Sequence, residues 1–310
     1  MIPGAYGLFL ALGVAAGAAV IYRLAPRLSL DPRTAMDMVF WSVLAGMVGA
    51  RVLYVLVEWS YFRDLCFSPE LREVPGIPCT SAADCMPGQQ CDGQWCRMQG
   101  DCLAALKVWE GGYVFLGGLA AGVATAALFM RRARIPLAAG FGLLSTALPL
   151  GHAFGRVGCF FHGCCYGRTS DHLPAIDGRF PIQLVEAAGN LLIFGLVLRA
   201  LLRATRSPSP AAAGELSGAL VRPIGTYFLL YGLLRLVTEL GRGDPQRGYL
   251  FEVPWPAFSR ALGFPEWEPV LLSTSQSISV VLVAAGALLL VRRAGPSRAG
   301  GATPGSRGPS

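Results

Sequence analysis

Charged side chains are scarce in this chain. Its 26 Lys and Arg and 19 Asp and Glu make up 15% of the 310 residues, whereas a soluble globular domain has about 25%. Hydrophobic residues reach 53%, which excludes a disordered chain, because disorder needs low hydrophobicity. The net charge of +7 is thinly spread, which excludes a conventional nucleic-acid binder with a basic groove. A coiled coil is excluded too, because it is rich in charged residues.

Histidine is also rare, with three residues, and no two cysteines have the CxxC spacing. We predict neither a metal ion nor a cofactor. Cysteine itself is plentiful, since six of the nine lie within residues 66–102. That density is unusual for a protein of the reducing cytosol. Composition therefore predicts a membrane protein with one oxidised face outside the bilayer.

Seven segments are long and apolar enough to predict membrane-spanning helices, which need about 20 mostly apolar residues. The first segment has no basic residues before its apolar run, so we interpret it as a retained helix rather than a signal peptide. The predicted fold is an all-α polytopic membrane protein. Its predicted spans are residues 6–21, 36–56, 113–130, 140–153, 183–201, 224–240 and 270–291.

The charges of the connecting segments predict the orientation. Segment 58–111 holds eight acidic and four basic residues, so it is predicted to be external. Basic segments belong on the cytoplasmic side; they are 23–34, 131–136, 199–222 and the tail after residue 291. The N-terminus is therefore predicted outside and the C-terminus in the cytoplasm. The predicted parts are spans one and two (1–57), a cysteine-rich insertion (58–111), spans three to seven (112–293) and a disordered tail (294–310).

The external insertion contains six cysteines, which we expect to form three disulfides. Disulfides would stabilise a segment that is too small for a hydrophobic core of its own. Fifteen pairings are possible, and the sequence does not choose among them. A metal site is the rival interpretation, although the segment has no histidine. The expected role is a structural or partner-binding cap. The cysteines are Cys66, Cys79, Cys85, Cys91, Cys96 and Cys102.

Polar residues within the apolar segments are the candidate functional residues, because charge at membrane depth is costly. Tyr231, Arg235, Glu239 and Arg242 are spaced to share one helical face. Arg235 and Glu239 are able to neutralise each other, which would be a purely structural role. Several arginines on different helices would repel one another unless an anion lies among them, and a lipid phosphate is the obvious anion. The others are Tyr6, Arg51, Arg156, Gln183 and Glu186.

All of these residues except Arg242 fall in six ordered motifs that resemble the bacterial prolipoprotein diacylglyceryl transferase family. The motifs are Tyr-Gly at 6–7, Gly-Ala-Arg-x-x-Tyr at 49–54, Trp-x-Gly-Gly-x-x-Phe-x-Gly-Gly at 109–118, Gly-Arg-x-Gly at 155–158 with Tyr-Gly-Arg at 166–168, Pro-x-Gln-Leu-x-Glu at 181–186 and Tyr-Gly-x-x-Arg-x-x-x-Glu at 231–239.

The resemblance implies a multi-pass protein of the bacterial inner membrane with its cysteine-rich loop in the periplasm. Its implied partners are phosphatidylglycerol and prolipoproteins whose signal peptides carry a lipobox cysteine. A diacylglyceryl group would move to that thiol, forming a thioether and releasing glycerol phosphate. Arg156 and Arg235 would stabilise the phosphate charge, and Tyr231 and Glu239 would orient Arg235. The expected substrate-binding residues are Tyr6, Arg51, Gly117, Gly118, Gly155, Gly158, Cys159, Gly167, Gln183, Glu186 and Arg242.

The chain departs from the family at the proton-transfer step. The family histidine before Gly117 is Leu116 here, and the family asparagine after Gly158 is Cys159. His162 is a candidate proton acceptor, because histidine titrates near neutral pH, and deprotonation assisted by the phosphate is the alternative. Two other interpretations stay open. One is a relative that binds anionic lipid with lost or altered transfer, and the other is a thiol-based redox or metal protein.

The second interpretation rests on Cys159, Cys164 and Cys165. Two of these thiols would form a local disulfide if the loop faces an oxidising compartment. A metal site that includes His162 is a further alternative, and so is redox catalysis.

Overall fold

The computed structural model describes residues 4–67, 78–81, 84–85, 89–91, 93–98, 100–108, 111–206, 213–244 and 248–291. The predicted tail 294–310 lies outside the described residues, as do parts of the predicted insertion and of the basic segment 199–222. The chain divides into two compact units, residues 1–36 with 134–310 and residues 37–133. Each unit is described by itself.

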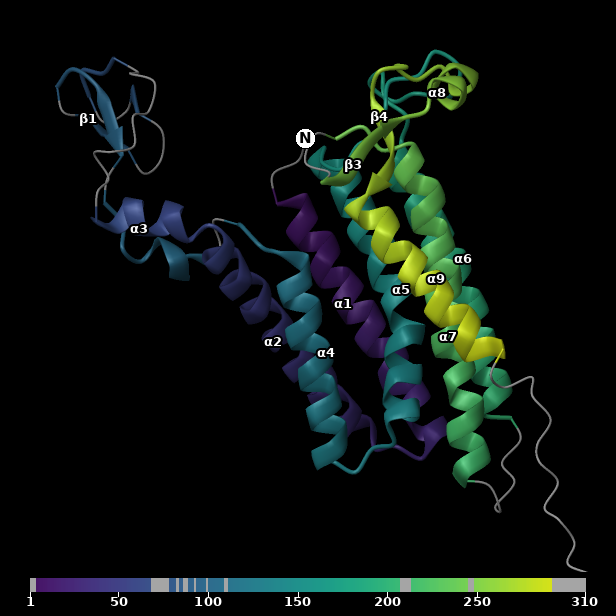
Figure 1. Cartoon of the computed structure of the whole chain (residues 1–310). Coiled ribbons are helices and arrows are strands. Elements are labelled where there is room, and N and C mark those ends of the chain that lie inside the picture. The colour runs from purple at the N-terminus through teal and green to yellow at the C-terminus, as the bar shows by residue number, and fades with distance from the viewer. Residues whose placement is uncertain are drawn as a thin grey trace, which may run out of the picture. The chain divides into compact units, whose positions relative to one another are not determined.

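The first unit is built from five long helices. Helix α1 (Ala5–Leu24) continues into the short helix η1 (Ala25–Leu28) and packs on α5 (Leu137–His162). Helix α5 also packs on α6 (Ile182–Ala204) and α7 (Ala213–Leu240), and α7 packs on α9 (Thr274–Val291), as Figure 1 shows. A Cβ on Gly13 of α1 would lie only 3.0 Å from the Phe154 side chain. Small residues at such contacts let membrane helices approach closely.

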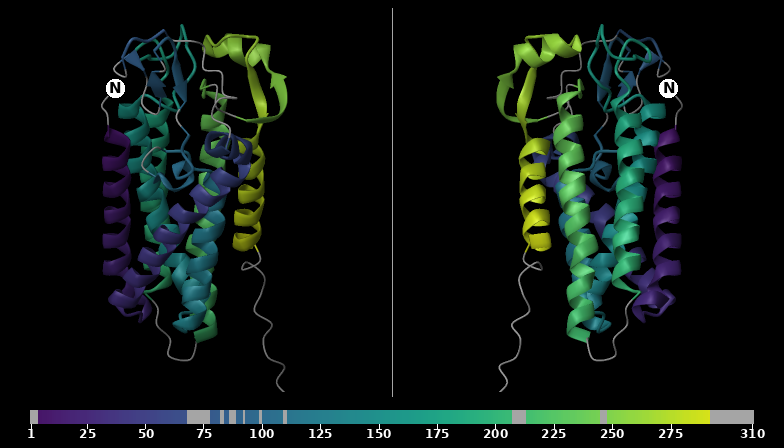
Figure 2. Two further views of the ribbon diagram at one scale, coloured as in Figure 1. Left: turned by 90° about the vertical axis from the view of Figure 1, so that its left-hand side faces the viewer. Right: turned by 90° about the vertical axis from the view of Figure 1, so that its right-hand side faces the viewer.

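Two strands and a short helix follow α7 and cap one end of this unit. They are β3 (Tyr249–Pro254), α8 (Pro256–Leu262) and β4 (Pro269–Ser273). β3 and β4 pair antiparallel, and both views of Figure 2 place them with α8 beyond the start of α9. The predicted last span, 270–291, is wrong at its start, because residues 270–273 belong to β4. The all-α prediction also needs this correction, although helices carry the fold.

The second unit contains α2 (Pro32–Val57), most of which lies in it, with α3 (Trp59–Phe67) and α4 (Phe115–Arg132). Helices α2 and α4 meet through small residues. A Cβ on Gly49 would lie 2.4 Å from the Ala121 side chain, and one on Gly117 would lie 2.4 Å from the Gly49 carbonyl oxygen. Neither glycine tolerates a side chain without moving the helices, so both are required for packing.

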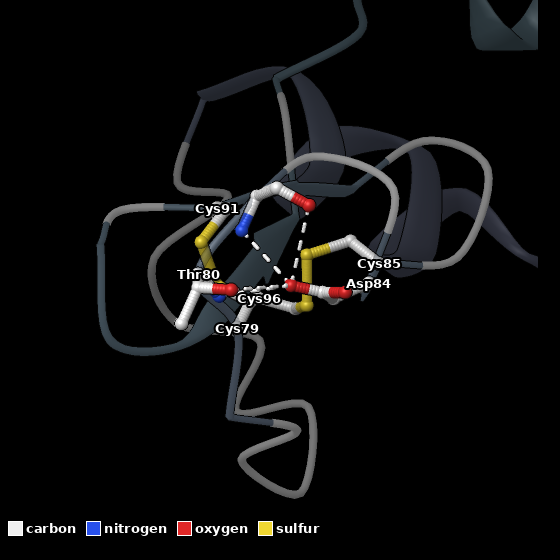
Figure 3. Close-up of a disulfide and its surroundings, with 7 residues drawn as sticks. Cys79, Thr80, Asp84, Cys85, Cys91 and Cys96 are labelled. Atoms are coloured by element: carbon white, nitrogen blue, oxygen red, sulfur yellow. Dashed lines mark hydrogen bonds between the residues drawn. A yellow bond between two sulfur atoms is a disulfide. The ribbon is translucent and has the colours of Figure 1, made fainter.

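The cysteine-rich insertion begins with α3 and leads to α4. Three disulfides join its cysteines, as Cys66–Cys102, Cys79–Cys91 and Cys85–Cys96. The last two (Figure 3) attach to the hairpin of β1 (Gln89–Cys91) and β2 (Cys96–Met98) through Cys91 and Cys96. The short helix η4 (Ala104–Leu106) follows this hairpin in the chain. Thus covalent bonds hold a segment that contains little regular structure.

Asp84 organises the turn beside these disulfides. One oxygen of its carboxylate accepts hydrogen bonds from the backbone N–H groups of Thr80 and Ser81, both at 2.9 Å, and from their hydroxyls (Figure 3). The Thr80 N–H contributes most to holding the pKa of Asp84 below its usual range. The carboxylate is therefore needed in its charged form for this turn.

Six helices among the described residues are long and apolar enough to cross a membrane. They establish a mostly helical, polytopic membrane protein. The predicted span 140–153 is too short, because α5 runs on to His162, and the predicted span 224–240 begins too late, because α7 starts at Ala213. Helix α4 has 18 residues and ends in Arg131 and Arg132. The six helices are Ala5–Leu28, Pro32–Val57, Leu137–His162, Ile182–Ala204, Ala219–Leu240 and Thr274–Val291.

Candidate functional site

A buried arginine on α7 is the centre of the candidate site. The Arg235 guanidinium donates through Nη1 to Glu186 of α6 and through Nη2 to Glu239 at 2.7 Å. Nη2 also donates to the Ser275 hydroxyl of α9 at 2.9 Å. Glu186 and Glu239 are each only 1% exposed. Arg235 is therefore committed to three protein partners.

Glu186 joins Arg235 to the second predicted arginine. Its Oε2 forms an ion pair with Nε of Arg156 on α5, although this contact is not an aligned hydrogen bond. The Arg156 side chain is 20% exposed, against 8% for Arg235. The described residues give the two terminal amino groups of Arg156 no hydrogen-bond partner. Arg156 is thus the arginine able to accept a ligand.

A third arginine extends the same array beyond the end of α7. Arg242 donates to both carboxylate oxygens of Asp244, at 2.7 and 2.8 Å, and lies 3.5 Å from Glu239. Three arginines and three carboxylates therefore alternate, and their formal charges cancel. Carboxylates, rather than an external anion, balance the arginines in this structure, which corrects the argument that such arginines need a phosphate among them.

Aromatic rings and a histidine border the array along α5 and α7. Tyr231 stacks on Tyr227 with ring centroids 5.4 Å apart, and His152 lies 4.9 Å from Tyr231. Nδ1 of His152 is buried without a hydrogen bond within the described residues. Tyr231 was expected to orient Arg235, but Glu186, Glu239 and Ser275 bind that guanidinium instead. The tyrosine rings form the apolar wall beside it.

The turn after α5 brings three cysteines together. Gly163 ends the helix with φ +80°, and the N–H groups of Gly163 and Cys164 both donate to the Cys159 carbonyl. The three Sγ atoms of Cys159, Cys164 and Cys165 lie within 4.8 Å of one another, and none is in a disulfide. Hydrogen bonds from Cys159 and Cys164 lower the pKa of the Cys165 thiol. The turn thus holds a compact thiol group beside Arg156.

Two predicted lining residues contact this turn. The Gln183 side chain donates to the Cys164 carbonyl at 2.9 Å. Tyr6 of α1 is 42% exposed, and its ring centroid lies 6.2 Å from that of His162. His162 itself is exposed. The structure therefore gathers Tyr6, Gln183 and His162 near the end of α5 without an ion pair of their own.

Most of the glycines expected to bind substrate lie at close packing contacts. A Cβ on Gly118 would lie 3.0 Å from the Gly46 carbonyl oxygen, one on Gly158 2.9 Å from the Phe9 side chain, and one on Gly167 2.2 Å from the Phe180 carbonyl oxygen. These three serve close packing, as Gly117 does. Gly155 alone of the predicted set has open space where its Cβ would be.

Arg51, another predicted substrate-binding residue, fastens a loop in the second unit. Its guanidinium donates to the carbonyls of Ala104 at 2.7 Å, Ala105 at 3.0 Å and Gly112 at 3.2 Å, and to that of Gly111. Its central carbon lies 5.5 Å from the Tyr54 ring centroid. Most of its donors are thus used on the segment that leads from the insertion to α4.

Arg51→Ala is expected to loosen that segment. A hydrogen bond from a charged donor contributes about 1.5–3 kcal/mol, so amides in 104–108 and 111–114 should exchange at least about tenfold faster. Hydrogen exchange with mass spectrometry measures this. Arg63→Ala is the matched control, because Arg63 forms an exposed pair with Asp64. If amide exchange in Arg51→Ala is unchanged and the KM for lipid rises, Arg51 binds substrate as the sequence predicted.

Three functional neighbours were missed by sequence reasoning. Asp244 was detectable, since an acid two residues after Arg242 is well placed for an ion pair. No feature of the sequence identified Ser275 as a neighbour of Arg235. Arg168 was quoted only as part of a motif, yet it is 2% exposed and binds Glu268 at 2.5 Å and the Pro269 carbonyl at 2.6 Å. It fastens the turn after α5 to β4.

Helices of membrane-spanning length that enclose an arginine–carboxylate array define a polytopic membrane protein with a polar site. The family model for prolipoprotein diacylglyceryl transferase matches residues 4–292. The chain belongs to this family, which confirms the resemblance derived from the ordered motifs.

Named relatives agree with this assignment. A phosphatidylglycerol–prolipoprotein diacylglyceryl transferase of Rhizobium leguminosarum bv. trifolii is 29% identical over 279 residues, covering 84% of this chain and 82% of the relative. One of Finegoldia magna is 25% identical over 292 residues, covering 93% of this chain and 90% of the relative. One of Hydrogenovibrio crunogenus is 33% identical over 175 residues, covering 53% of this chain and 60% of the relative.

Proposed function

We propose that this protein transfers a diacylglyceryl group from phosphatidylglycerol to the lipobox cysteine thiol of prolipoproteins, forming a thioether and releasing glycerol phosphate. The observation that carries the proposal is the buried array of Arg156, Glu186 and Arg235 among membrane-spanning helices of a chain in this family. A lipid donor requires a site inside the bilayer. A phosphate leaving group requires nearby cations to stabilise its developing charge.

Arg156 is the proposed contact with the phosphate. Its Nε pairs with Glu186, which fixes the plane of the guanidinium, while its two terminal amino groups are left for ligand oxygens. Arginine binds phosphate through paired, parallel donors. As the carbon–oxygen bond breaks, charge grows on the leaving phosphate, and Arg156 stabilises it there.

Arg235 and Glu239 are proposed as positioning residues. Arg235 binds the Glu186 carboxylate oxygen that Arg156 does not contact, and Glu239 and Ser275 hold Arg235 in turn. A carboxylate fixed between two arginines keeps each at a set distance from the other. The remaining predicted residues, Tyr6, Gln183, Tyr231 and Arg242, would line the site around this centre.

The proposed topology has seven spans, with α4 as the additional one. The N-terminus lies outside, and the basic segments and the C-terminus lie in the cytoplasm, as the positive-inside rule favours. The disulfides of the insertion support an external, periplasmic position, because structural disulfides persist in oxidising compartments. The protein would thus reside in the bacterial inner membrane.

The test is transfer by purified protein in lipid nanodiscs. Phosphatidylglycerol labelled in its diacylglyceryl part is incubated with a lipobox peptide, and mass spectrometry detects the thioether. We expect product with the cysteine peptide and none with the matching serine peptide or with phosphatidylethanolamine nanodiscs. Binding of phosphatidylglycerol without any thioether would instead identify a lipid-binding relative that has lost transfer.

A further inference from the structure

Three cysteines of this chain stay outside its disulfides. Six of the nine cysteines form disulfides in the insertion. Cys159, Cys164 and Cys165 are free thiols, and their Sγ atoms lie within 4.8 Å of one another. Around a tetrahedral zinc ion with Zn–S bonds of about 2.3 Å, sulfur atoms lie about 3.8 Å apart. Small side-chain rotations would therefore bring the three sulfurs onto one ion.

The backbone is shaped to gather these thiols. Gly163 ends α5, and the chain turns back so that the Cys164 N–H donates to the Cys159 carbonyl at 3.1 Å. Cys165 has φ +55°, a left-handed conformation that costs a residue with a side chain about 1 kcal/mol or more. The Gln183 amide fixes the turn through the Cys164 carbonyl. Strain of this kind persists where the surrounding structure enforces it, often at ligand sites.

Two arginines of the array interact with this group of thiols. Arg156 and Arg242 both interact electrostatically with Cys165. Three thiolates with one divalent cation carry a net charge of −1, and Arg156 and Arg242 attract this charge although carboxylates of the array already balance them. Cys159 is buried, whereas Cys164 and Cys165 are half-buried. The group therefore has one enclosed side and one side open to a further ligand.

The proposed reaction needs a group that removes the proton of the acceptor thiol, and a metal site would do this. The acceptor must react as a thiolate, because a thiol is a poor nucleophile. The position of the family histidine is Leu116 in this chain, and leucine cannot take a proton. A thiol bound to a metal ion loses its proton outright. Catalytic zinc sites combine three protein ligands with an open position for water or substrate.

We propose that Cys159, Cys164 and Cys165 bind a zinc ion whose open position takes the acceptor cysteine of the prolipoprotein as a thiolate. This inference rests on the proposed transferase function and revises our sequence prediction that the protein binds no metal. It does not use His162, which is outside the group of three ligands that the described residues define.

The step is redox-neutral and balanced. The peptide thiol coordinates zinc and releases its proton to solvent. Its sulfur then attacks the terminal glycerol carbon of the diacylglyceryl group, forming the carbon–sulfur bond. The carbon–oxygen bond to phosphate breaks, and the electron pair leaves with glycerol phosphate beside Arg156. The product thioether is a weaker zinc ligand than a thiolate, so it dissociates.

The first experiment measures metal and substrate binding on the whole protein, purified with zinc under conditions that keep the three insertion disulfides intact. We expect one zinc ion per chain by elemental analysis. The double variant C164S/C165S should lose it, whereas C85S/C96S, which removes one insertion disulfide, should keep it. After cobalt replacement, the visible absorption of thiolate-bound cobalt should shift on adding the lipobox peptide and stay unchanged with the serine peptide.

The second experiment links metal to turnover and separates the two proposals. Removing zinc from wild-type protein with a chelator should lower transfer at least about 100-fold, as expected for loss of metal activation, and adding zinc should restore it. Leu116→His should bring little gain. Full transfer by metal-free protein, or a disulfide among the three thiols in active protein, would overturn the zinc site and leave the transferase intact. If the protein binds zinc but forms no thioether, the proposed transferase function is contradicted instead.

Discussion

Arg156→Ala is expected to lower kcat/KM for diacylglyceryl transfer at least about 100-fold while the protein still folds. Loss of one donor that stabilises charge in the transition state typically costs this much. Arg156 is the most exposed arginine of the array, and its only ion pair among the described residues is with Glu186. Glu186 keeps Arg235 as a partner in the variant. Initial rates at several lipid concentrations, with a thermal melt in detergent, measure both effects.

Two further variants make this result specific. Arg156→Lys should recover only part of the activity, because lysine has no planar pair of amino groups to match a phosphate. Arg199→Ala is the matched control, since Arg199 is an exposed arginine on α6. A near-normal rate in Arg156→Ala would show that the phosphate is held elsewhere.

Glu186→Gln is expected to have the largest effect on stability. Both oxygens of Glu186 face arginines, and its side chain is 2% exposed. Removing its charge leaves Arg156 and Arg235 with one fewer counter-ion at membrane depth. Breaking a buried ion pair from one side costs about 3–5 kcal/mol. Equilibrium unfolding in mixed micelles should show this loss, and transfer activity should fall with it.

An exposed pair provides the comparison for this variant. Glu266 lies 3.7 Å from Arg260, and both side chains are largely exposed. Glu266→Gln should therefore change the free energy of unfolding by less than about 1 kcal/mol. If Glu186→Gln changes the free energy of unfolding as little as Glu266→Gln does, the array is hydrated, and its ion pairs contribute little to the stability of the helix bundle.

Apolar runs predicted the helices but not where they end. The predicted fourth span stopped at residue 153 because polar His152 and Arg156 interrupt the run, yet α5 continues to His162. Arg156 can remain helical because Glu186 on the neighbouring helix supplies a counter-charge. The segment of β3, α8 and β4 was not predicted, since strand pairing across α8 depends on residues far apart in sequence.

The sequence predicted which residues belong to the candidate site, but it did not predict most of the contacts between them. Spacing predicted Arg235, Glu239 and Arg242 on one helical face. This is wrong for Arg242, because α7 ends at Leu240, but ion pairs still link the three residues. That Glu186 bridges two arginines depends on how α5, α6 and α7 pack, which spacing within one helix cannot supply. The carbonyl partners of Arg51 were not predicted for the same reason, because they lie more than 50 residues away in the chain.

The Cys66–Cys102 disulfide closes the insertion at its base. The two Cα atoms are 4.3 Å apart, and the Asp101 N–H donates to the Leu65 carbonyl at 3.1 Å beside them. Within the second unit, α3 and the segment before α4 are thus held at a fixed spacing whatever lies between them. The segment between Cys66 and Cys102 can therefore change in length or sequence during evolution while the membrane helices keep their packing.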